Sequence, residues 1–311
     1  MQQEHQQPIR PLRLRPGDTI GIVAPASPFD RKAFGSGIAV LESMGFQVSV
    51  PEDLAAHEGY LAGSDAHRGE MVNRLFADPA IDAILCARGG FGSMRMLSHL
   101  DFESIREHPK ILVGFSDVTA LLSAVYERCG LVTYHGPVVA TLGEASRETQ
   151  ASFYHTVTAD ENLVISADEA TTLRPGSATG PVSGGNLATL CHLVGTPYQP
   201  SFYGHILMLE ETGEKPYRID RMLTQMRLAG CLDGVAGLVL GAFDECGDGE
   251  GIFGILEAIF KEGAVPMLAG LDFGHGRHNL TIPLGLAATL DADAQTLSYL
   301  EPSTRLPEIV A

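Results

Sequence analysis

The chain has 311 residues, of which 45% are hydrophobic, 21 are Lys or Arg and 38 are Asp or Glu. This length and apolar content are enough for a large buried core and are typical of a globular protein with two domains. The formal net charge of -17 disfavours nucleic acid or an anionic membrane surface as a partner, and an anionic substrate would need a local basic pocket.

The cysteines predict buried thiols in a reducing compartment, because they are odd in number, widely spaced and mostly set among apolar neighbours. They are Cys86, Cys129, Cys191, Cys231 and Cys246. The polar first seven residues lack the apolar core of a signal peptide, and no stretch reaches the roughly 18 apolar residues of a membrane span. We therefore expect a cytoplasmic protein with no membrane partner.

Residues 19 to about 140 alternate short β-rich runs with helical segments, which is typical of a wound parallel sheet. The expected strands are Thr19 to Ala24, Gln47 to Val50, Ala83 to Ala87, Ile111 to Gly114 and Leu131 to Tyr134, with helices at Arg31 to Met44, Ala66 to Phe76 and Gly92 to Leu97. We predict an α/β domain over residues 1–150 whose pattern resembles that of class I glutamine amidotransferase domains.

The remainder of the chain predicts a linker or crossover over residues 151–180 and a smaller α+β domain with a curled sheet over residues 181–311. Its expected elements are a helix start at Gly184 to Leu187, a helix at Pro216 to Leu228, and strands at His205 to Leu209, Gly234 to Leu240, Leu286 to Leu290 and Thr296 to Leu300.

Three expected strands end in small or glycine-rich turns, at residues 24–27, 87–92 and 114–116. Carboxyl ends of parallel strands meet at one edge of a sheet, where ligands bind. The turn at Gly114-Phe115-Ser116 resembles a nucleophile elbow, which lifts a serine above the sheet at the start of a helix. Val118 stands where the full pattern has a second glycine, and Ser116 before an aspartate could instead cap the helix.

A serine nucleophile needs a base, and the base needs an orienting acid. His275 lies between two glycines in a loop after a strand-like run, so it is the first candidate base, with His278 and His135 as rivals. An ordinary surface-loop histidine is the alternative interpretation of His275.

Glu210, at the end of the strand-like run 206–209, is the first candidate acid. Glu211 is expected to be exposed or bonded to backbone, and Glu214 and Asp220 to lie in or near a helix as solvated charges. The order serine, acid, histidine is that of enzymes with an elbow serine.

An oxyanion hole requires two backbone donors. The Asp117 amide and an amide of the Gly89-Gly90 turn are the natural candidates, because glycine lets the backbone approach a ligand. A phosphate-binding function for this turn is weakly supported, since it lacks both the P-loop ending and the dinucleotide spacing.

These motifs together resemble the LD-carboxypeptidases, the serine peptidases of the murein tetrapeptide carboxypeptidase and microcin-immunity family. The matching segments are residues 14–18 and 20–25, 87–92, 114–117, 134–137, 184–187, 195–197, 209–211 with Tyr217 and Arg221, 274–275, and 283–285. The resemblance implies a catalytic triad of Ser116, Glu210 and His275, with Gly90 as an oxyanion donor beside Asp117. Two departures are Glu211, where the family often has Asp, and His278, where it often has Pro.

The resemblance also implies the reaction. It is hydrolysis of the bond between the L-centre of a diamino acid and the terminal D-alanine of murein tetrapeptides, in peptidoglycan recycling in the cytoplasm. No metal or organic cofactor is implied, and a homodimer is the family expectation. Arg88 is a candidate partner for the substrate's terminal carboxylate, with a structural salt bridge as the alternative.

Two other functions stay open. An immunity enzyme that cleaves a peptide-nucleotide antibiotic would stack an aromatic side chain on the base, and this chain has no tryptophan, although tyrosine or phenylalanine could serve. A non-catalytic protein that binds cell-wall peptides would bind without turnover. An amidotransferase-like activity would require a cysteine at the elbow, where this chain has Ser116.

Overall fold

The computed structural model describes residues 7–167 and 169–307. Residues 1–6, most of the polar stretch for which the sequence predicts no signal peptide, lie outside the described residues. Within the described part, no helix is both long and apolar enough to cross a bilayer.

The first sheet has six strands in the order β12-β5-β4-β3-β1-β2. Its strands are β1 (Thr19–Val23), β2 (Gln47–Ser49), β3 (Ala83–Cys86), β4 (Ile111–Gly114), β5 (Thr133–His135) and β12 (Ile282–Leu284). Neighbours among β1 to β5 run parallel, as the alternating pattern predicts. Strand β12 was not predicted; it returns from far along the chain and pairs antiparallel with β5.

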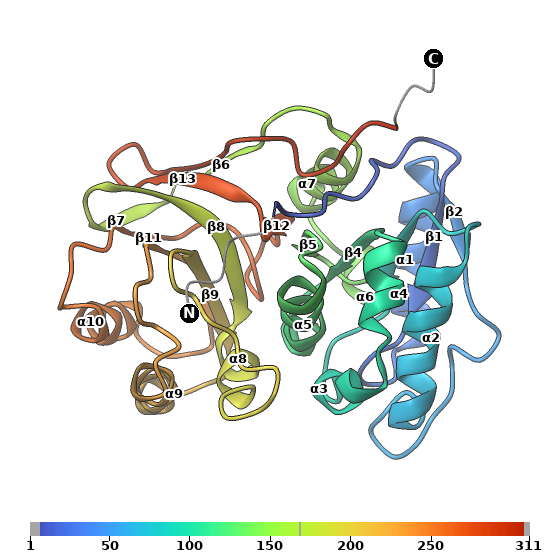
Figure 1. Ribbon diagram of the computed structural model, residues 1–311, viewed down its shortest axis with the longest axis horizontal. Coiled ribbons are helices and arrows are strands. Elements are labelled where there is room, and N and C mark those ends of the chain that lie inside the picture. The colour runs from blue at the N-terminus through green and yellow to red at the C-terminus, as the bar shows by residue number, and fades with distance from the viewer. Residues whose placement is uncertain (1–6, 168, 308–311) are drawn as a thin grey trace.

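Helices cover this sheet and connect its strands (Figure 1). They are α1 (Arg31–Ser43), α2 (Asp65–Ala77), α3 (Ser93–Met96), η1 (Leu97–His99), α4 (Phe102–Glu107), η2 (Ser116–Val118), α5 (Thr119–Cys129), α6 (Val139–Leu142) and α7 (Arg147–Thr158). Asp30, Ser64 and Ser146 cap the amino ends of the three longest helices through their side-chain oxygens. The caps of α1 and α2 set where these helices begin, close to the predicted boundaries, whereas α7 was not predicted.

The second sheet has eight strands in the order β6-β14-β13-β8-β9-β10-β11-β7. Its elements are β6 (Val164–Ser166), β7 (Thr171–Arg174), β8 (Ser177–Asn186), β9 (Ile206–Thr212), β10 (Gly237–Asp244), β11 (Met267–Ala269), β13 (Ala287–Asp291) and β14 (Thr296–Tyr299), with helices α8 (Leu187–His192), α9 (Pro216–Leu228) and α10 (Gly249–Ile259). Strands β8 to β11 are parallel, and the outer strands are antiparallel to their neighbours. The predicted linker, residues 151–180, contains part of α7, β6, β7 and the start of β8; the domain boundary itself stays a prediction.

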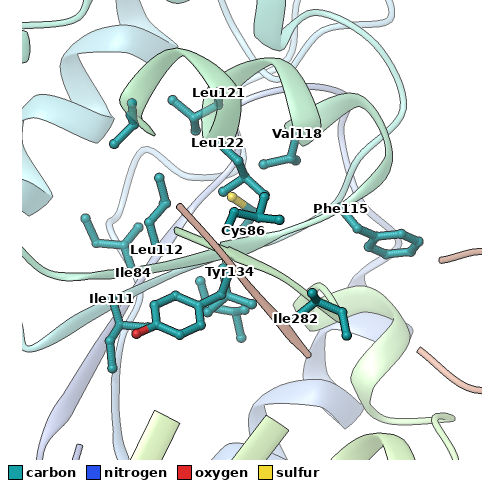
Figure 2. Packing of buried hydrophobic residues seen from close by; sticks show 14 of the residues in the cluster. Ile84, Cys86, Ile111, Leu112, Phe115, Val118, Leu121, Leu122, Tyr134 and Ile282 are labelled. Carbon is teal, nitrogen blue, oxygen red and sulfur yellow. The ribbon is translucent and has the colours of Figure 1, made fainter. Parts of the chain in front are cut away.

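Helix α5 lies between the two sheets and contacts both, through β4 and β5 on one side and β8 and α8 on the other (Figure 1). Its residues from Thr119 to Val125 are all buried, so the helix is held from every side. Figure 2 shows Val118, Leu121 and Leu122 in the apolar cluster with strand residues such as Leu112. A strand and a helix that are both immobilised in this way form a rigid base for the turn between them.

Candidate active site

Ser116 lies at a sharp turn between a buried strand and this helix. Strand β4 ends at Gly114, Phe115 is extended with φ -155° and ψ -174°, and Ser116 has a φ of +64°. A positive φ costs a residue with a Cβ roughly 1–2 kcal/mol, which the surrounding packing must offset. This strained strand-to-helix turn has the backbone geometry of a nucleophile elbow.

Gly114 explains how the elbow accommodates Val118 in place of a second glycine. A Cβ at residue 114 would lie 2.6 Å from Cγ1 of Val118 and 3.2 Å from Sγ of Cys86. The valine side chain therefore fills the space that the first glycine leaves open. The capping role considered for Ser116 is not observed, because neither η2 nor α5 has a side-chain hydrogen bond at its N-cap.

The Gly89-Gly90 turn after β3 packs directly against Ser116. A Cβ at Gly89 would lie 3.0 Å from Cβ and 3.2 Å from Oγ of Ser116, so only glycine permits this close approach. Gly90 has a φ of +108° and faces Ser27, whose Oγ would lie 2.5 Å from an added Cβ. In residues 7–167 and 169–307, no protein group accepts a hydrogen bond from the Gly90 amide. The turn thus has the close backbone and the uncommitted amide that an oxyanion donor requires.

Asp117 ties this turn to the elbow. Its Oδ2 accepts a 2.8 Å hydrogen bond from the amide of Ser93, and its carbonyl accepts one from the Ser93 hydroxyl. The amide of Asp117 lies in the first turn of η2, where N–H groups have no intrahelical acceptor. One residue therefore anchors the glycine turn through its carboxylate and carbonyl and offers an amide beside the serine.

Glu210 and His275 form a hydrogen-bonded pair. Oε2 of Glu210 accepts a 2.6 Å bond from Nδ1 of His275 and a 3.1 Å bond from the His275 backbone amide. With the hydrogen on Nδ1, the other ring nitrogen, Nε2, is the basic one. Glu210 is completely buried in β9, whereas 21% of the His275 side chain is exposed. Two bonds to one buried oxygen fix the orientation of the imidazole.

His275 lies beside the elbow. Its ring centroid is 4.8 Å from that of Phe115, the residue before the serine. In the described chain the Ser116 hydroxyl makes no hydrogen bond to His275; such bonds are often long in ligand-free sites and tighten when substrate binds. The structure thus gathers the three predicted residues at the junction of the two sheets, with Ser116 from the first and Glu210 from the second.

The charges around His275 favour its protonated form. Burial opposes protonation, but the hydrogen bond and charge of Glu210, together with the charges of Glu211 and Asp244, outweigh burial and raise the pKa of His275 above its usual 6.5. A carboxylate that stabilises the imidazolium is what a base needs when it removes a proton during reaction.

This electrostatic environment predicts the pH dependence of activity. The imidazole accepts a proton only when it is neutral, so kcat/KM should fall as the pH is lowered through the raised pKa of His275. We expect the acidic limb of the kcat/KM profile to lie above pH 6.5, the usual value for histidine. A profile measured between pH 5 and 9, on the order of the range in which histidines titrate, checks this; a limb well below that value would contradict it.

The two rival histidines have other surroundings. Nδ1 of His278 lies 2.8 Å from Oγ of Ser146 and 3.8 Å from Oε2 of Glu148. His135 is completely buried and neither ring nitrogen has a hydrogen-bond partner; burial lowers its pKa to about 4. Neither histidine hydrogen-bonds to Glu210, so His275 alone of the three has the acid partner.

The other predicted charged residues have partners outside the Glu210–His275 pair. Glu211 is buried and bonded to backbone amides of Ala188 and Thr212, and burial raises its pKa. Glu214 pairs with Arg218 at 3.3 Å, near the start of α9. Arg88 is exposed and donates to the carbonyl of Pro28 at 2.8 Å, and within the described residues it forms no salt bridge.

In the described residues, no three histidine, cysteine, aspartate or glutamate side chains gather as metal ligands would. All five cysteines are buried and free, as their apolar neighbours predicted.

Sequence reasoning missed the residues that support the site. Ser27, which accepts a 3.1 Å hydrogen bond from the Phe91 amide, lies in one of the strand-end turns, and that placement could have suggested it. Ser93 donates to Asp117, and Oδ1 of Asn279 accepts a 2.9 Å hydrogen bond from the Gly274 amide. Both contacts depend on packing and have no sequence signal.

Gly274 offers a stability test of this geometry. It has a φ of +91°, and a Cβ would lie 2.5 Å from Oε2 of Glu210. We expect Gly274→Ala to lower the free energy of unfolding by at least about 2 kcal/mol and to displace the acid. Gly254→Ala is the matched control: it lies exposed within α10 with nothing near its Cβ, and should raise stability by roughly 0.5–1 kcal/mol. Equal effects in chemical denaturation would contradict the prediction.

A strained serine beside an oriented histidine and a buried glutamate, on a two-domain α/β fold, defines a hydrolase-type site. The LD-carboxypeptidase N-terminal domain matches residues 20–136, and the LD-carboxypeptidase C-terminal domain matches residues 179–290. The chain belongs to the LD-carboxypeptidase family, and is a carboxypeptidase of the serine type.

Individual relatives agree along nearly the whole chain. A Bacillus subtilis protein named "Probable murein peptide carboxypeptidase" is 36% identical over 92% of this chain and 93% of its own. The murein tetrapeptide carboxypeptidase of Pseudomonas aeruginosa is 33% identical over 88% of this chain and 93% of its own. The solved structure of MccF in complex with glutamyl sulfamoyl guanosine superimposes with a TM-score of 0.89 at 26% identity, covering 96% of this chain and 100% of MccF.

Proposed function

We propose that this protein is a serine LD-carboxypeptidase that releases the terminal D-alanine of murein tetrapeptides. The observation that carries the proposal is the 2.6 Å hydrogen bond that Nδ1 of His275 donates to the buried carboxylate of Glu210. This pair lies beside the strained elbow of Ser116. The names of the Bacillus and Pseudomonas relatives support murein peptide as the substrate.

Acylation starts at the serine. Nε2 of His275 accepts the hydroxyl proton of Ser116 while Oγ bonds to the carbonyl carbon that precedes D-alanine. The negative charge of Glu210 stabilises the resulting imidazolium. The carbonyl oxygen becomes an oxyanion that the amides of Gly90 and Asp117 stabilise, and because both amides are held before substrate binds, no reorganisation is needed.

The same histidine completes the reaction. His275 gives its proton to the nitrogen of D-alanine, the carbon–nitrogen bond breaks, and D-alanine leaves with an acyl-enzyme behind it. Water then attacks the ester carbon as His275 takes its proton, and the return of that proton to Oγ frees Ser116. The exposed guanidinium of Arg88, with donors not used by Pro28, is our candidate for binding the substrate's terminal carboxylate.

We further propose that the protein acts in peptidoglycan recycling in the cytoplasm, as a homodimer, and that it uses no cofactor. We likewise infer from its wound parallel sheet that the first domain resembles class I glutamine amidotransferase domains.

The test is release of free D-alanine from a purified murein tetrapeptide, with the same peptide ending in L-alanine as the control. We expect release from the first and none from the second, because the bond that the family cleaves joins an L- to a D-centre. Equal release from both peptides would contradict LD-specificity, and peptide binding without turnover would favour a non-catalytic binding protein.

One observation favours antibiotic immunity as a second candidate. Tyr60 and Phe91 are 62% and 48% exposed, their rings meet edge to face at 5.6 Å, and Phe91 directly follows Gly90. Such a pair could stack on a nucleobase, and MccF, a microcin C7 self-immunity protein, binds glutamyl sulfamoyl guanosine in its solved structure. Cleavage of an aminoacyl-nucleotide analogue in preference to tetrapeptide would favour this candidate.

A further inference from the structure

A buried arginine lies behind the glycine turn that packs on Ser116. In the part of the chain that the structure describes, Arg68 is the one arginine that is buried, with 0% of its surface exposed. It lies near the start of α2, and Asp65 on the same helix accepts a hydrogen bond from its Nη2. A buried charge is costly unless it is paired and hydrogen-bonded, so the other partners of this guanidinium indicate what its burial achieves.

The remaining hydrogen bonds of Arg68 go to backbone carbonyls of three loops. Nη1, which has two hydrogens, donates to Pro25, in the turn after β1, and to Gly92 at 2.7 Å, in the turn after β3. Nε donates to Gly63 at 3.3 Å, in the loop before α2. Strands β1 and β3 are parallel neighbours, so one planar side chain joins the turns at the edge of the sheet where Ser116 also lies.

The contact with the second turn depends on glycine at residue 92. Gly92 has a φ of +123°, and a Cβ there would lie 3.0 Å from Nη1 of Arg68 and 2.5 Å from Cδ2 of Leu61. Glycine therefore lets the guanidinium reach the carbonyl. Burial lowers the pKa of Arg68 and the charge of Asp65 opposes this, but an arginine stays protonated in a protein, so all of its N–H donors are kept.

Ser27 holds the same turn from the other side. Its amide donates to the carbonyl of Gly89 at 3.3 Å, and its Oγ accepts the 3.1 Å hydrogen bond from the Phe91 amide. Both neighbours of Gly90 are thus bound to one serine, whereas the Gly90 amide has no acceptor within residues 7–167 and 169–307. The turn is fixed on each side of an amide that the proposed oxyanion site requires.

We propose that Arg68 and Ser27 are positioning residues that together hold the Gly90 amide beside Ser116 before substrate binds. This inference rests on the proposed function, in which that amide stabilises the oxyanion. Ser27 fixes the residues on either side of Gly90, and Arg68 joins the chain just before Ser27 to the chain just after the glycine turn. A donor aligned in advance needs no reorganisation during reaction, and a displacement of about 1 Å can cost on the order of a hundredfold in rate.

The test uses two substitutions and a matched control. Arg68→Lys replaces the planar fork by a single nitrogen, which cannot bind acceptors at both the Nε and the Nη1 positions. Ser27→Ala removes the acceptor of the Phe91 amide and keeps the Cβ of the side chain. Arg74→Lys is the control, because this exposed arginine lies on the same helix but pairs with Asp53, at 3.0 and 3.1 Å.

Two reactions are measured for each variant, at a temperature where circular dichroism shows that it is fully folded. The first is release of D-alanine from murein tetrapeptide, which gives kcat and KM. The second is the rate at which an alkyl fluorophosphonate labels Ser116, followed by the mass of the intact protein. In that reaction Oγ bonds to phosphorus, fluoride leaves, and the phosphoryl oxygen takes the oxyanion position, so the label reports on the amides without any peptide. Ser116→Ala should show no labelling.

We expect Arg68→Lys to lower kcat and the labelling rate by about ten- to a hundredfold and Ser27→Ala by about tenfold, because complete loss of an oxyanion donor costs about a hundred- to a thousandfold. KM should change by less than about threefold, since the displaced amide acts in the transition state rather than in substrate binding. Arg74→Lys should keep both rates within about twofold of the wild-type values, as surface ion pairs contribute little.

Two results would overturn the proposal. One is a folded Arg68→Lys or Ser27→Ala variant whose kcat and labelling rate stay within about twofold of wild type, and the other is a rise in KM at constant kcat. If Arg68→Lys does not fold, Ser27→Ala decides alone, because it loosens the same turn with the arginine in place.

The two reactions also separate this inference from the proposed function. If the intact protein is labelled at Ser116 but releases no D-alanine, the proposed substrate fails, while the labelling rates still decide whether Arg68 and Ser27 position the Gly90 amide. Absence of both labelling and D-alanine release in the intact protein overturns the two proposals together.

Discussion

Ser116→Ala should lower kcat/KM for D-alanine release by about ten-thousand-fold or more. The substitution removes the attacking Oγ, while the amides of Gly90 and Asp117 remain to bind substrate and polarise its carbonyl, so a small residual rate is expected. Because the loss is in chemistry, substrate affinity measured by calorimetry should change little. A loss of less than about tenfold would remove Ser116 from the mechanism.

The strain at this serine adds a second readout. Glycine adopts the φ of +64° without the cost of a Cβ, although it also gains freedom in the unfolded chain. Ser116→Gly should therefore be as inactive as Ser116→Ala but more stable than it by roughly 0.5–1 kcal/mol in urea unfolding. Ser43→Ala, an exposed helical serine, is the activity control and should keep wild-type kcat/KM. Equal stability of the two elbow variants would contradict the strain.

Glu210→Gln should lower kcat by about a thousand- to ten-thousand-fold. The amide keeps the size of the side chain and one acceptor oxygen, but it loses the charge that stabilises the imidazolium, and its NH2 group can favour the wrong tautomer of the imidazole. The pKa of His275 should fall as well, because the hydrogen bond and charge of Glu210 raise it in the intact protein. The acidic limb of any remaining activity should consequently move to lower pH.

The control for this change is Glu214→Gln, which removes a carboxylate that pairs with Arg218 near the start of α9. Its expected effect on kcat is less than about twofold, since surface ion pairs contribute little. Similar losses of kcat in Glu210→Gln and Glu214→Gln would show that Glu210 is not the acid partner of His275. An NMR titration of His275 would then give the same pKa in both variants as in the intact protein.

Local patterns were sufficient for the parallel strands of the first sheet and for the position of the elbow. Parallel strands buried on both faces leave continuous apolar runs, and glycine-rich turns mark their ends, so β1, β3 and β4 are visible within a few residues of their bounds. Strand β12 has no such signature, because three residues that pair with β5 across a gap of more than a hundred residues carry no period of their own.

Local patterns also did not decide which histidine is the base. Motifs and chain order pointed to Ser116, Glu210 and His275, but they left His135 and His278 open as bases. Packing separates the three: the segment after β11 brings His275 onto Glu210, a partner at the end of another strand, while His278 bonds to Ser146.

By itself, the sequence determined which residue types lie at the ends of which strands, because hydrophobic period and glycine placement are local properties of the chain. Only the tertiary structure decided the positive φ of Ser116, the approach of Gly89 to its hydroxyl, and the bond from His275 to Glu210. Each of these depends on distances between segments far apart in the chain, which packing of the two sheets around α5 sets and which no local pattern encodes.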